Sequence, residues 1–510
     1  MNSNPRHQTA TFVRIVPLVV AGILLGRWLD VEWWLTAVGC GVCIGGALVA
    51  NMLRTKGRSN EAKEDNLTYK RVANIYIAAA IIMGSMTSAT LNATPTDMPY
   101  GERLAVMASV EREYKQAGTH NRYHVRIKTE GGKSYLVELR ADTALHIATG
   151  DKIALRCSFS PMSSDSYGRL MHHRGVSGKG YISRAEDVVK VGTTTSFAIV
   201  AQRCQAWLLE RFERLGVEGD TEAVCKAMTF GERQQMSPSL RESYSRSGCA
   251  HLLAISGLHV GIVAMLVWLL CGLMPIAVRH GHIWRNVICS AVMITYAFVT
   301  GGSPSVLRAT LMFCTAQLTL AYGTTRSTIG SLAGAITLML LANPNNLYDI
   351  SFQLSALAVA GIMTGYTLLF EPLRTRSVVV NYAWGVTVVG VCATLTTLPL
   401  VAHTFGVVSL VGVVLNPVVI ATAHVVVLGS LVWTLLPWEP LQAPLKAMVE
   451  WAAELQNGCV EVVGSLPWGA VDITPPAWVV IVGYLAMAVV LAAAVRNTRK
   501  NRKTEWIAKS

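Results

Sequence analysis

The chain has 510 residues, of which 52% are hydrophobic and only 15% are charged, with 44 Lys and Arg against 31 Asp and Glu. Soluble domains carry about 25% charged residues, so this chain has too few charges to cover a surface that faces water. Mean hydropathy is +0.40, and apolar runs of about 20 residues recur along the chain. The composition excludes a soluble enzyme, a disordered protein and a fibrous protein, and it predicts a polytopic helical membrane protein.

The first 96 residues hold three apolar segments, near 12–29, 31–53 and 72–92. The first segment follows basic residues as a signal peptide does, but no small-residue cleavage site follows it. We therefore interpret it as an uncleaved membrane helix. The loop over 54–71 has six basic and three acidic residues. The positive-inside rule places this loop in the cytoplasm, and the chain then leaves the third helix on the outer side.

Residues 97–190 are polar and predict a small β domain. Apolar and polar residues alternate over 122–129 and again over 134–140, on either side of a Gly-Gly turn, which predicts a β-hairpin. The other expected elements are strands near 104–111, 152–159 and 179–191 and a short helix over 141–149. Three strands, a helix and two strands are the element order of a five-stranded OB-type barrel.

The rest of the chain divides into three parts. Residues 191–243 are amphipathic and are expected to lie along the membrane surface. Residues 244–496 hold eight apolar segments and predict a helical bundle in lipid, for a total of about 11–12 spans. The tail, 497–510, is basic and is expected in the cytoplasm together with the N-terminus. The expected fold class is a polytopic α-helical membrane protein with an extracytoplasmic all-β OB-like domain after the third span.

One apolar run begins like a membrane helix but contains residues that lipid does not favour. They are Arg246, His251, Ser256, Gly257 and His259. Ser-Gly weakens helix continuity, so the run predicts a helix broken over 254–261 whose freed backbone groups line a wet cavity. A kinked packing helix with both histidines satisfied internally is the alternative. Metal binding and serine hydrolysis are disfavoured, because no carboxylate lies nearby and the G-x-S-x-G pattern is missing.

A second apolar run contains Arg308, which costs about 2.5–3.5 kcal/mol at a helix centre if it is unpaired. Arg308 must therefore face a partner, a cavity or the bundle interior. Asp349 and Gln353, one helical turn apart in a third run, supply a candidate. An ion pair between Arg308 and Asp349 is one interpretation. Contact of these groups with an anionic solute in transit is the other.

A fourth run, 398–419, combines helix breakers with polar residues at membrane depth. Its two prolines and Gly406 are expected to break helices, and His403 and Asn416 are polar within it. The eleven cysteines are odd in number, and most lie in apolar runs, where a thiol acts as a small hydrophobe. The one C-x-x-C pair lies inside a candidate membrane helix without a second ligand pair, so we expect no metal and no cofactor.

Several of these runs resemble motifs of the ComEC competence family, inner-membrane proteins that import DNA during natural transformation. The family signature is resembled by AMTFGERQQMSPSLRESYSRSGCAHLLAISGLHVGIVA. Its later motifs are resembled, in order and at similar spacing, by GGSPSVLRATLMF, NPNNLYDISFQLSALAVAGI and LPLVAHTFGVVSLVGVVLNPVV. The end of the family's outer OB-like domain is resembled by SYGRLMHHRGVSGKGYI. The resemblance covers roughly 97–436 and implies a multi-pass protein of the bacterial cytoplasmic membrane whose helices form an aqueous path for single-stranded DNA.

We expect two sets of site residues. The candidates for the translocation path are Arg246, His251, Ser256, Gly257, His259, Arg308, Asp349, Gln353, His403 and Asn416. Single-strand binders combine basic grooves with stacking aromatics. The candidates for DNA contact in the β domain are Arg122, Tyr123, Arg126, Lys128, Arg140, Arg156 and Tyr181. An ordinary solvated face is the alternative there, because 97–190 carries 15 basic and 11 acidic residues.

Two departures from the family pattern bear on activity and partners. Many members continue into a metallo-β-lactamase-like domain thought to degrade the non-transported strand, but no H-x-H-x-D-H cluster occurs here. We therefore expect no enzyme activity and no metal. Some members have a disulfide in the outer domain, which is impossible within 97–190 because Cys157 is the only cysteine there. The expected partners are single-stranded DNA, membrane lipid, and a separate DNA receptor, nuclease and cytoplasmic helicase or motor, with a homo-oligomer also open.

The leading hypothesis is thus a channel subunit for DNA uptake, and two others stay open. One is a transporter or flippase for another polyanionic or lipid-linked solute. The other is a membrane enzyme in which Ser256 or His259 performs chemistry. The absence of a hydrolase motif from the sequence counts against it.

The basic loop predicts the orientation of the chain. In a variant without native cysteines, Gly132→Cys should react with an impermeant thiol reagent on intact cells, because 97–190 is expected outside. Asn66→Cys, in the basic loop, is the matched control and should react only after the cytoplasm is opened. Labelling of position 132 only in opened cells would reverse the predicted orientation.

Overall fold

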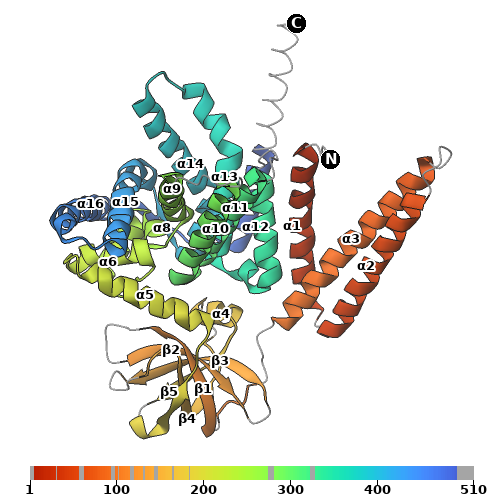
Figure 1. Cartoon of the computed structure of the whole chain (residues 1–510), viewed down its shortest axis with the longest axis horizontal. Helices are drawn as coiled ribbons and strands as arrows, with labels where there is room; N and C mark the ends of the chain where they lie inside the picture. Colours follow the sequence, from red (N-terminus) through yellow and green to blue (C-terminus); the bar gives the residue numbers. More distant parts are fainter. Residues whose placement is uncertain are drawn as a thin grey trace. The chain divides into compact units, whose positions relative to one another are not determined.

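The computed structural model describes most of the chain. The described residues are 5–29, 31–56, 63–92, 98–101, 103–114, 120–129, 132–142, 147–163, 166–182, 184–273, 281–321 and 328–490. Contacts divide the chain into two units, which are described separately. Unit 1 comprises residues 1–202, 282–286 and 310–352, and unit 2 comprises residues 203–281, 287–309 and 353–510. The fold is mostly helical, with a small β-barrel after the third helix (Figure 1).

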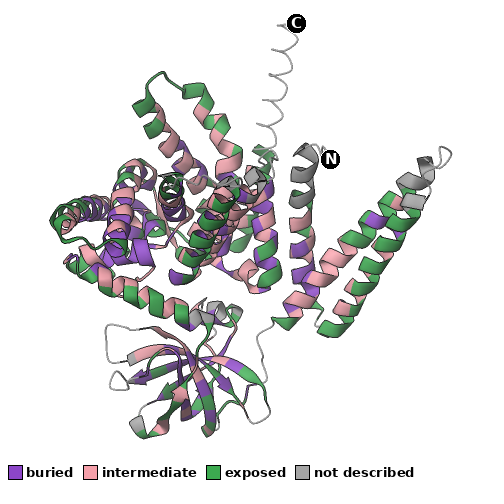
Figure 2. Ribbon diagram, in the orientation of Figure 1, coloured by how far each residue is buried: buried purple, intermediate pink, exposed green. Residues whose placement is uncertain are grey.

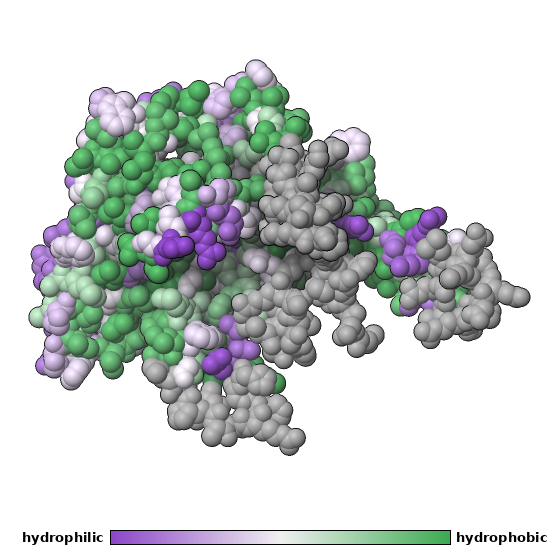
Figure 3. All heavy atoms as spheres, turned by 90° about the horizontal axis from the view of Figure 1, so that it is seen from above, coloured by the Kyte–Doolittle hydropathy of each residue, from purple (hydrophilic) through white to green (hydrophobic). Residues whose placement is uncertain are grey.

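Apolar helices confirm the predicted membrane class. Among the described residues, five helical segments are long and apolar enough to cross a membrane: Trp33–Leu53, Thr68–Leu91, Ile350–Leu373, Val378–Phe405 and Gly412–Leu435. Four apolar helices in the described part are shorter: Gly257–Gly272, Ile283–Val299, Thr328–Ala342 and Ala477–Val490. The face drawn in Figure 3 is largely apolar, as expected of helices that meet lipid. The total of about 11–12 spans stays a prediction, and the basic tail lies outside the described residues.

Unit 1 begins with three helices, α1 (Pro5–Trp28), α2 (Trp33–Lys56) and α3 (Lys63–Leu91). The third packs against both others, and α2 is exposed along much of its length (Figure 2). Gly22 lets α1 approach α3 closely, because a Cβ there would overlap the carbonyl oxygen of Ile82. The N-terminal region therefore forms a helical hairpin and a third helix, as its three apolar segments predict.

The described part of the β domain contains six strands and one helix, and five of the strands form a barrel while β6 pairs with β4 beside it. They are β1 (Arg103–Tyr114), β2 (His120–Lys128), β3 (Ser134–Asp142), β4 (Asp151–Ser160), α4 (Ser166–His173), β5 (Val176–Ile182) and β6 (Val188–Thr193). The strand order is β1-β2-β3-β5-β4, and antiparallel pairing of β1 with β4 closes the five-stranded barrel. The antiparallel β2–β3 hairpin and the small barrel confirm the predicted all-β domain.

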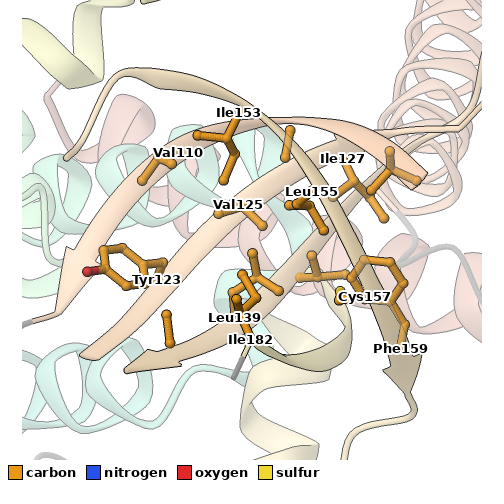
Figure 4. Close-up of a cluster of buried hydrophobic side chains, with 14 of the residues drawn as sticks. Val110, Tyr123, Val125, Ile127, Leu139, Ile153, Leu155, Cys157, Phe159 and Ile182 are labelled. Carbon is orange, nitrogen blue, oxygen red and sulfur yellow. The ribbon is translucent and has the colours of Figure 1, made fainter. Parts of the chain in front are cut away.

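Alternation of side chains fills the barrel. Figure 4 shows the inward residues of facing strands meeting in one apolar cluster, which includes Val125 of β2, Leu139 of β3 and Leu155 of β4. Val125 is completely buried, and Leu139 and Leu155 are 1% and 3% exposed. Because successive residues of a strand point to opposite faces, the residues between them point outward.

Two elements of the barrel differ from the prediction. The helix follows the fourth strand instead of the third, and the expected helix over 141–149 falls partly on residues outside the described part. The last strand, expected over 179–191, is two strands, because the turn at 185–187 separates β5 from β6. Each of the two pairs with a different part of β4. A period of two within one segment does not show which part of a neighbouring strand the segment pairs with.

A short 3₁₀ helix, η2 (Pro344–Tyr348), lies where several elements of unit 1 meet. It contacts α3, α4 and α12 (Thr328–Ala342). Arg27, near the end of α1, donates hydrogen bonds to the Asn345 side chain in η2 and to the carbonyl of Asn92 beyond α3. The ends of these elements therefore meet at one polar site, where hydrogen bonds satisfy groups that the helices leave open.

Asp349 follows η2 and binds the barrel. Its Oδ2 accepts hydrogen bonds from Arg174 Nη2 at 3.0 Å and Nε at 3.3 Å, and Arg174 lies in the turn between α4 and β5. Its Oδ1 accepts a bond from the backbone N–H of Ser351 at 2.8 Å, at the start of α13 (Ile350–Phe370). One carboxylate therefore caps a helix and holds the barrel through an ion pair.

The remaining labelled elements of the described residues are given next, and the apolar helix Ala477–Val490 follows the last of them. They are α5 (Phe197–Glu213), α6 (Gly219–Phe230), α7 (Pro238–Arg246), α8 (Ala250–Leu253), α9 (Gly257–Leu273), α10 (Gly281–Val299), α11 (Pro304–Ala321), η3 (Glu371–Leu373), α14 (Val378–Phe405), β7 (Val407–Ser409), α15 (Gly412–Leu435), α16 (Glu439–Gly464) and β8 (Ala470–Asp472). In unit 2, α15 packs against α6, α9, α14 and α16. The helix α6 is buried along 223–230. It therefore differs from the amphipathic surface helix that was expected within 191–243.

Buried hydrogen bonds connect the helices of unit 2. Gln456 of α16 donates to the hydroxyl of Tyr244 at 2.8 Å and accepts from the hydroxyl of Thr422 at 2.9 Å. The Tyr244 hydroxyl in turn donates to Asn457 at 2.8 Å. Such a network links α7, α15 and α16, and a buried polar group that kept no partner would cost about 1–3 kcal/mol.

The predicted helix breaks in the fourth apolar run are only partly present. Gly406 does end α14, in the left-handed conformation with φ 70°. Pro399 lies inside α14, however, and Pro417 lies inside α15, so neither proline breaks its helix. A proline removes one backbone hydrogen bond, and packing against neighbouring helices can maintain the helix around it.

The double role of Asp349 predicts a graded loss of stability. Asp349→Asn keeps an acceptor for the helix cap but loses the charge, and it should cost about 1 kcal/mol. Asp349→Ala also loses the cap and should cost about 2 kcal/mol. The protein purified in detergent should melt lower in the same order.

The control is a double-mutant cycle with Arg174→Gln. Combined with Asp349→Asn, it should add little beyond either single change, because both remove the same ion pair. Additive losses would contradict the pairing.

Candidate functional site

The break predicted over 254–261 in the first of the four apolar runs is present but shorter. It covers 254–256, between α8 and α9, and the chain is helical again from Gly257. The hydroxyl of Ser256 accepts a hydrogen bond from the Leu258 N–H at 3.2 Å and so caps α9. The Ser256 N–H donates to Nδ1 of His259 at 3.0 Å, so in a neutral ring the proton is on Nε2. His259 is completely buried, and its Nε2 has no hydrogen-bond partner in the described structure.

Arg308 lies beside this break. A Cβ built on Gly257, the first residue of α9, would be 3.7 Å from Arg308 Nη2 and 3.7 Å from the Cβ of Ala309. Arg308 is only 3% exposed, and neither its Nε nor its Nη1 makes a hydrogen bond to any described residue. The predicted polar residues Ser256, Gly257, His259 and Arg308 thus come together in unit 2.

Three motif segments meet at this place, which we call the motif junction. It consists of the α6–α7 turn at Gly231, the break at 254–257 and the α10–α11 turn at 300–303. Gly231 has φ 80°, and a Cβ on it would lie 2.9 Å from the carbonyl oxygen of Thr300 and 3.3 Å from Cδ1 of Ile255. Only glycine combines this conformation with so close an approach.

A further motif segment approaches the end of α7. Gly248 has φ 79°, and a Cβ on it would lie 2.8 Å from the Cβ of Ser409 in β7. A Cβ on Gly412 would lie 2.8 Å from the carbonyl oxygen of Ser247. The fourth apolar run is therefore packed on the backbone of the first. Asn416 of that run is buried at 6% exposure, beside Gly390 of α14.

The other path candidates lie apart from the motif junction or have partners of their own. Arg246 Nη1 is 3.9 Å from the Asp472 carboxylate. Exposed His251 bonds the Gly248 carbonyl through Nδ1 at 3.1 Å. Exposed His403 bonds the Pro475 carbonyl through Nδ1 at 2.8 Å.

The structure gives Asp349 a different partner from the predicted Arg308. Its carboxylate binds Arg174, which the tight turn at Gly175, with φ 86°, places at the barrel surface. Gln353, one turn further along α13, is half-buried. Asp349 therefore forms an ion pair within unit 1, and the charge of Arg308 has no acid assigned to it among the described residues.

Tyr123 is a correction among the DNA-contact candidates. It is 1% exposed in the barrel core, so its ring cannot stack on a base (Figure 4). Its place follows from the same alternation that puts Val125 and Ile127 inside. Tyr181, in contrast, is 51% exposed on β5.

Arg122, Arg140 and Tyr181 lie in register across β2, β3 and β5 on the outer face of the barrel. We call these three residues the basic row. The other candidates are exposed: Arg126, which forms an ion pair with Glu111, and Lys128 and Arg156. The arrangement of two guanidinium groups with an exposed aromatic ring is suited to a flexible single strand.

A buried acid lies beneath the basic row and was missed in the sequence. Glu138 is 1% exposed and accepts hydrogen bonds from Arg140 Nε at 3.2 Å and from the Tyr167 hydroxyl at 2.5 Å. Burial and the neighbouring Glu138 raise the pKa of Tyr167 to about 12. Tyr167 therefore stays protonated and donates, which compensates the buried carboxylate. An acidic residue between the apolar residues Val137 and Leu139 of β3 was the available signal.

Lys226 is a second buried charge that was missed. Its side chain is 3% exposed, and its Nζ donates to Glu213 at 2.6 Å, to Glu222 at 2.9 Å and to Gln235 at 3.0 Å. All three ammonium donors are thus used, which makes Lys226 a structural link between α5, α6 and the following turn. The signal in the sequence was a lone lysine within the apolar stretch of α6.

The motif junction predicts a strong effect of one methyl group. Gly231→Ala should destabilise the protein by about 3 kcal/mol, because it adds left-handed backbone strain and a clash with the Thr300 carbonyl. Gly219→Ala, at the other end of α6, is the control. Gly219 has φ 66° with nothing within 4 Å of the added Cβ, so only the strain of about 1 kcal/mol applies. Equal melting temperatures of the two variants would contradict the close approach.

Comparison with known proteins identifies relatives of the helical part. A family model described as "Competence protein" matches residues 228–497, which is more than half of the chain. The protein is 33% identical over 203 residues to ComE operon protein 3 of Bacillus subtilis (strain 168), a match that covers 39% of this chain and 24% of that protein. No solved structure matches.

Two uncharacterized relatives were also found. A protein of Aquifex aeolicus (strain VF5) is 30% identical over 158 residues, covering 31% of this chain and 36% of the relative. The protein YcaI of Escherichia coli (strain K12) is 30% identical over 156 residues, covering 28% of this chain and 20% of the relative. The matches thus span at most about a third of the relatives' lengths. Because the family model covers the whole motif junction, the chain belongs to the competence protein family.

Proposed function

We propose that this protein is a channel subunit of the bacterial cytoplasmic membrane through which single-stranded DNA enters the cell during natural transformation. The observation that carries the proposal is the match to the competence family over 228–497, which contains the motif junction. Buried Arg308, whose Nε and Nη1 have no partner in the described residues, supports an anionic solute there. The basic row on the barrel supports contact with a flexible strand before it enters the membrane.

In this proposal the protein moves DNA and performs no bond-breaking chemistry. A receptor that captures DNA, a nuclease that removes one strand and a cytoplasmic helicase or motor that pulls the other are separate proteins. The barrel lies outside and the termini lie inside the cell, in agreement with the basic loop over 54–71. A single strand carries one negative charge per nucleotide, so exposed cations at the entrance would raise its local concentration.

The test is uptake of a labelled DNA fragment by the bacterium that carries this gene. Deletion should abolish entry of the label into a nuclease-resistant state while leaving DNA bound at the cell surface. The wild-type gene should restore entry. Arg122→Gln with Tyr181→Ala, which removes two members of the basic row, should restore it about tenfold less, because a charge contact and a stacking platform are lost.

The control for that variant is Lys152→Gln with Val189→Ala. It removes one charge and one exposed side chain from β4 and β6, away from the basic row, and should restore uptake fully. Normal uptake in the deletion strain would contradict the proposed function. Equal losses in both double variants would contradict only the assigned role of the basic row.

A further inference from the structure

The positively charged Arg308 lies at the N-terminal end of α9, where a positive charge is unfavourable. The first turn of α9 presents backbone N–H groups that lack partners within the helix, so this end of the helix dipole is positive. The Arg308 guanidinium lies beside it, as the 3.7 Å distance from its Nη2 to a Cβ built on Gly257 records. Two positive groups therefore lie close together, and Arg308 is buried there with only 3% of its surface exposed. Such an arrangement is repulsive unless an anion joins them.

Two donors of the Arg308 guanidinium are unused. Its Nε and Nη1 are buried atoms without a hydrogen-bond partner among the described residues. The Ser256 hydroxyl accepts from the Leu258 N–H and so caps α9. The nearest acid predicted from the sequence, Asp349, is bound to Arg174. Unpaired guanidinium donors beside a helix N-terminus are the two elements of a protein anion site.

The first residue of α9 adds no side chain between the guanidinium and the helix turn. Gly257 has no side chain, and an added Cβ would meet Arg308 Nη2 and Ala309 Cβ only at ordinary contact distance. Alanine is therefore tolerated by the fold but occupies the space between the guanidinium and the helix turn. Gly261, one turn further along α9, has nothing within 4 Å of an added Cβ.

We propose that Arg308 and the first turn of α9 bind one phosphate group at a time, as the strand passes. A phosphodiester carries a single negative charge and oxygens that a guanidinium can bind in pairs while the helix N–H groups bind another. The inference rests on the proposed function for the origin of the phosphate. A phospholipid headgroup has the same chemistry, so the source of the phosphate is tested separately.

The test is the melting temperature of the full chain in dodecyl maltoside, a detergent without phosphate, at constant ionic strength. The probes are inorganic phosphate, a short thymidine oligonucleotide, its uncharged methylphosphonate analogue and phosphatidylglycerol. Inorganic phosphate and the oligonucleotide should raise the melting temperature of the wild type by about 2 °C or more, because a ligand that binds only the folded state stabilises it. The methylphosphonate should have no effect that depends on Arg308.

Four variants locate the effect. Without phosphate, Arg308→Gln should melt no lower than the wild type, because no buried acid loses its partner. With phosphate, its melting temperature should not rise. Arg308→Lys should keep part of the shift, since the charge remains but the paired donors do not. Gly257→Ala should fold normally and lose most of the shift. Gly261→Ala should keep all of it.

Three results would overturn the proposal. Collapse of Arg308→Gln in the absence of phosphate would make Arg308 a structural residue. An unchanged shift in Gly257→Ala would place the bound anion elsewhere. A shift that depends on Arg308 with phosphatidylglycerol alone would assign the phosphate to lipid rather than to the strand. If deletion of the gene leaves DNA uptake normal while the phosphate shift persists, the proposed function fails and the phosphate site stands.

Discussion

The ion pair between Arg174 and Asp349 joins the barrel to the helical part of unit 1. These residues are far apart in the chain, yet the guanidinium donates twice to one carboxylate oxygen. The other oxygen caps α13, so the same acid also determines where that helix begins. Neighbouring η2 holds the ends of α1 and α3 through Arg27 and Asn345. The position of the barrel within this unit therefore depends on a few polar contacts beside η2.

Buried charges in the described structure are of two kinds. Lys226 and Glu138 are each surrounded by groups of opposite charge or by hydrogen-bond donors, and their role is to hold elements together. Arg308 is as deeply buried, yet its Nε and Nη1 have no partner among the described residues. Because an uncompensated charge costs several kcal/mol, its presence in an apolar protein calls for a reason other than stability. A solute that carries negative charge supplies one.

Several glycines of the motif segments allow neighbouring backbones to pack closely. Gly231, Gly248 and Gly412 each stand where a Cβ would come within 3 Å of a neighbouring segment. Such contacts bring the turns around the α8–α9 break together and leave no freedom for a larger residue. The family motifs thus contain two kinds of residue, glycines that allow the motif junction to form and polar groups that it brings together.

Local patterns in the sequence determined the membrane class, the β-hairpin and the presence of a break between α8 and α9, although they predicted it over 254–261 and it covers only 254–256. These features depend on neighbours in the chain, which hydropathy and Ser-Gly within an apolar run reveal directly. The alternation over β2 also determined that Tyr123 faces the core, although its aromatic ring made it a candidate for DNA contact.

Only the tertiary structure decided which charges meet. Asp349 pairs with Arg174, which lies 175 residues earlier in the chain, because an ion pair depends on where distant turns are placed in space. The same reason separates β5 from β6, which pair with different parts of β4. Whether Pro399 breaks a helix was likewise decided by packing, because neighbouring helices can maintain α14 across it.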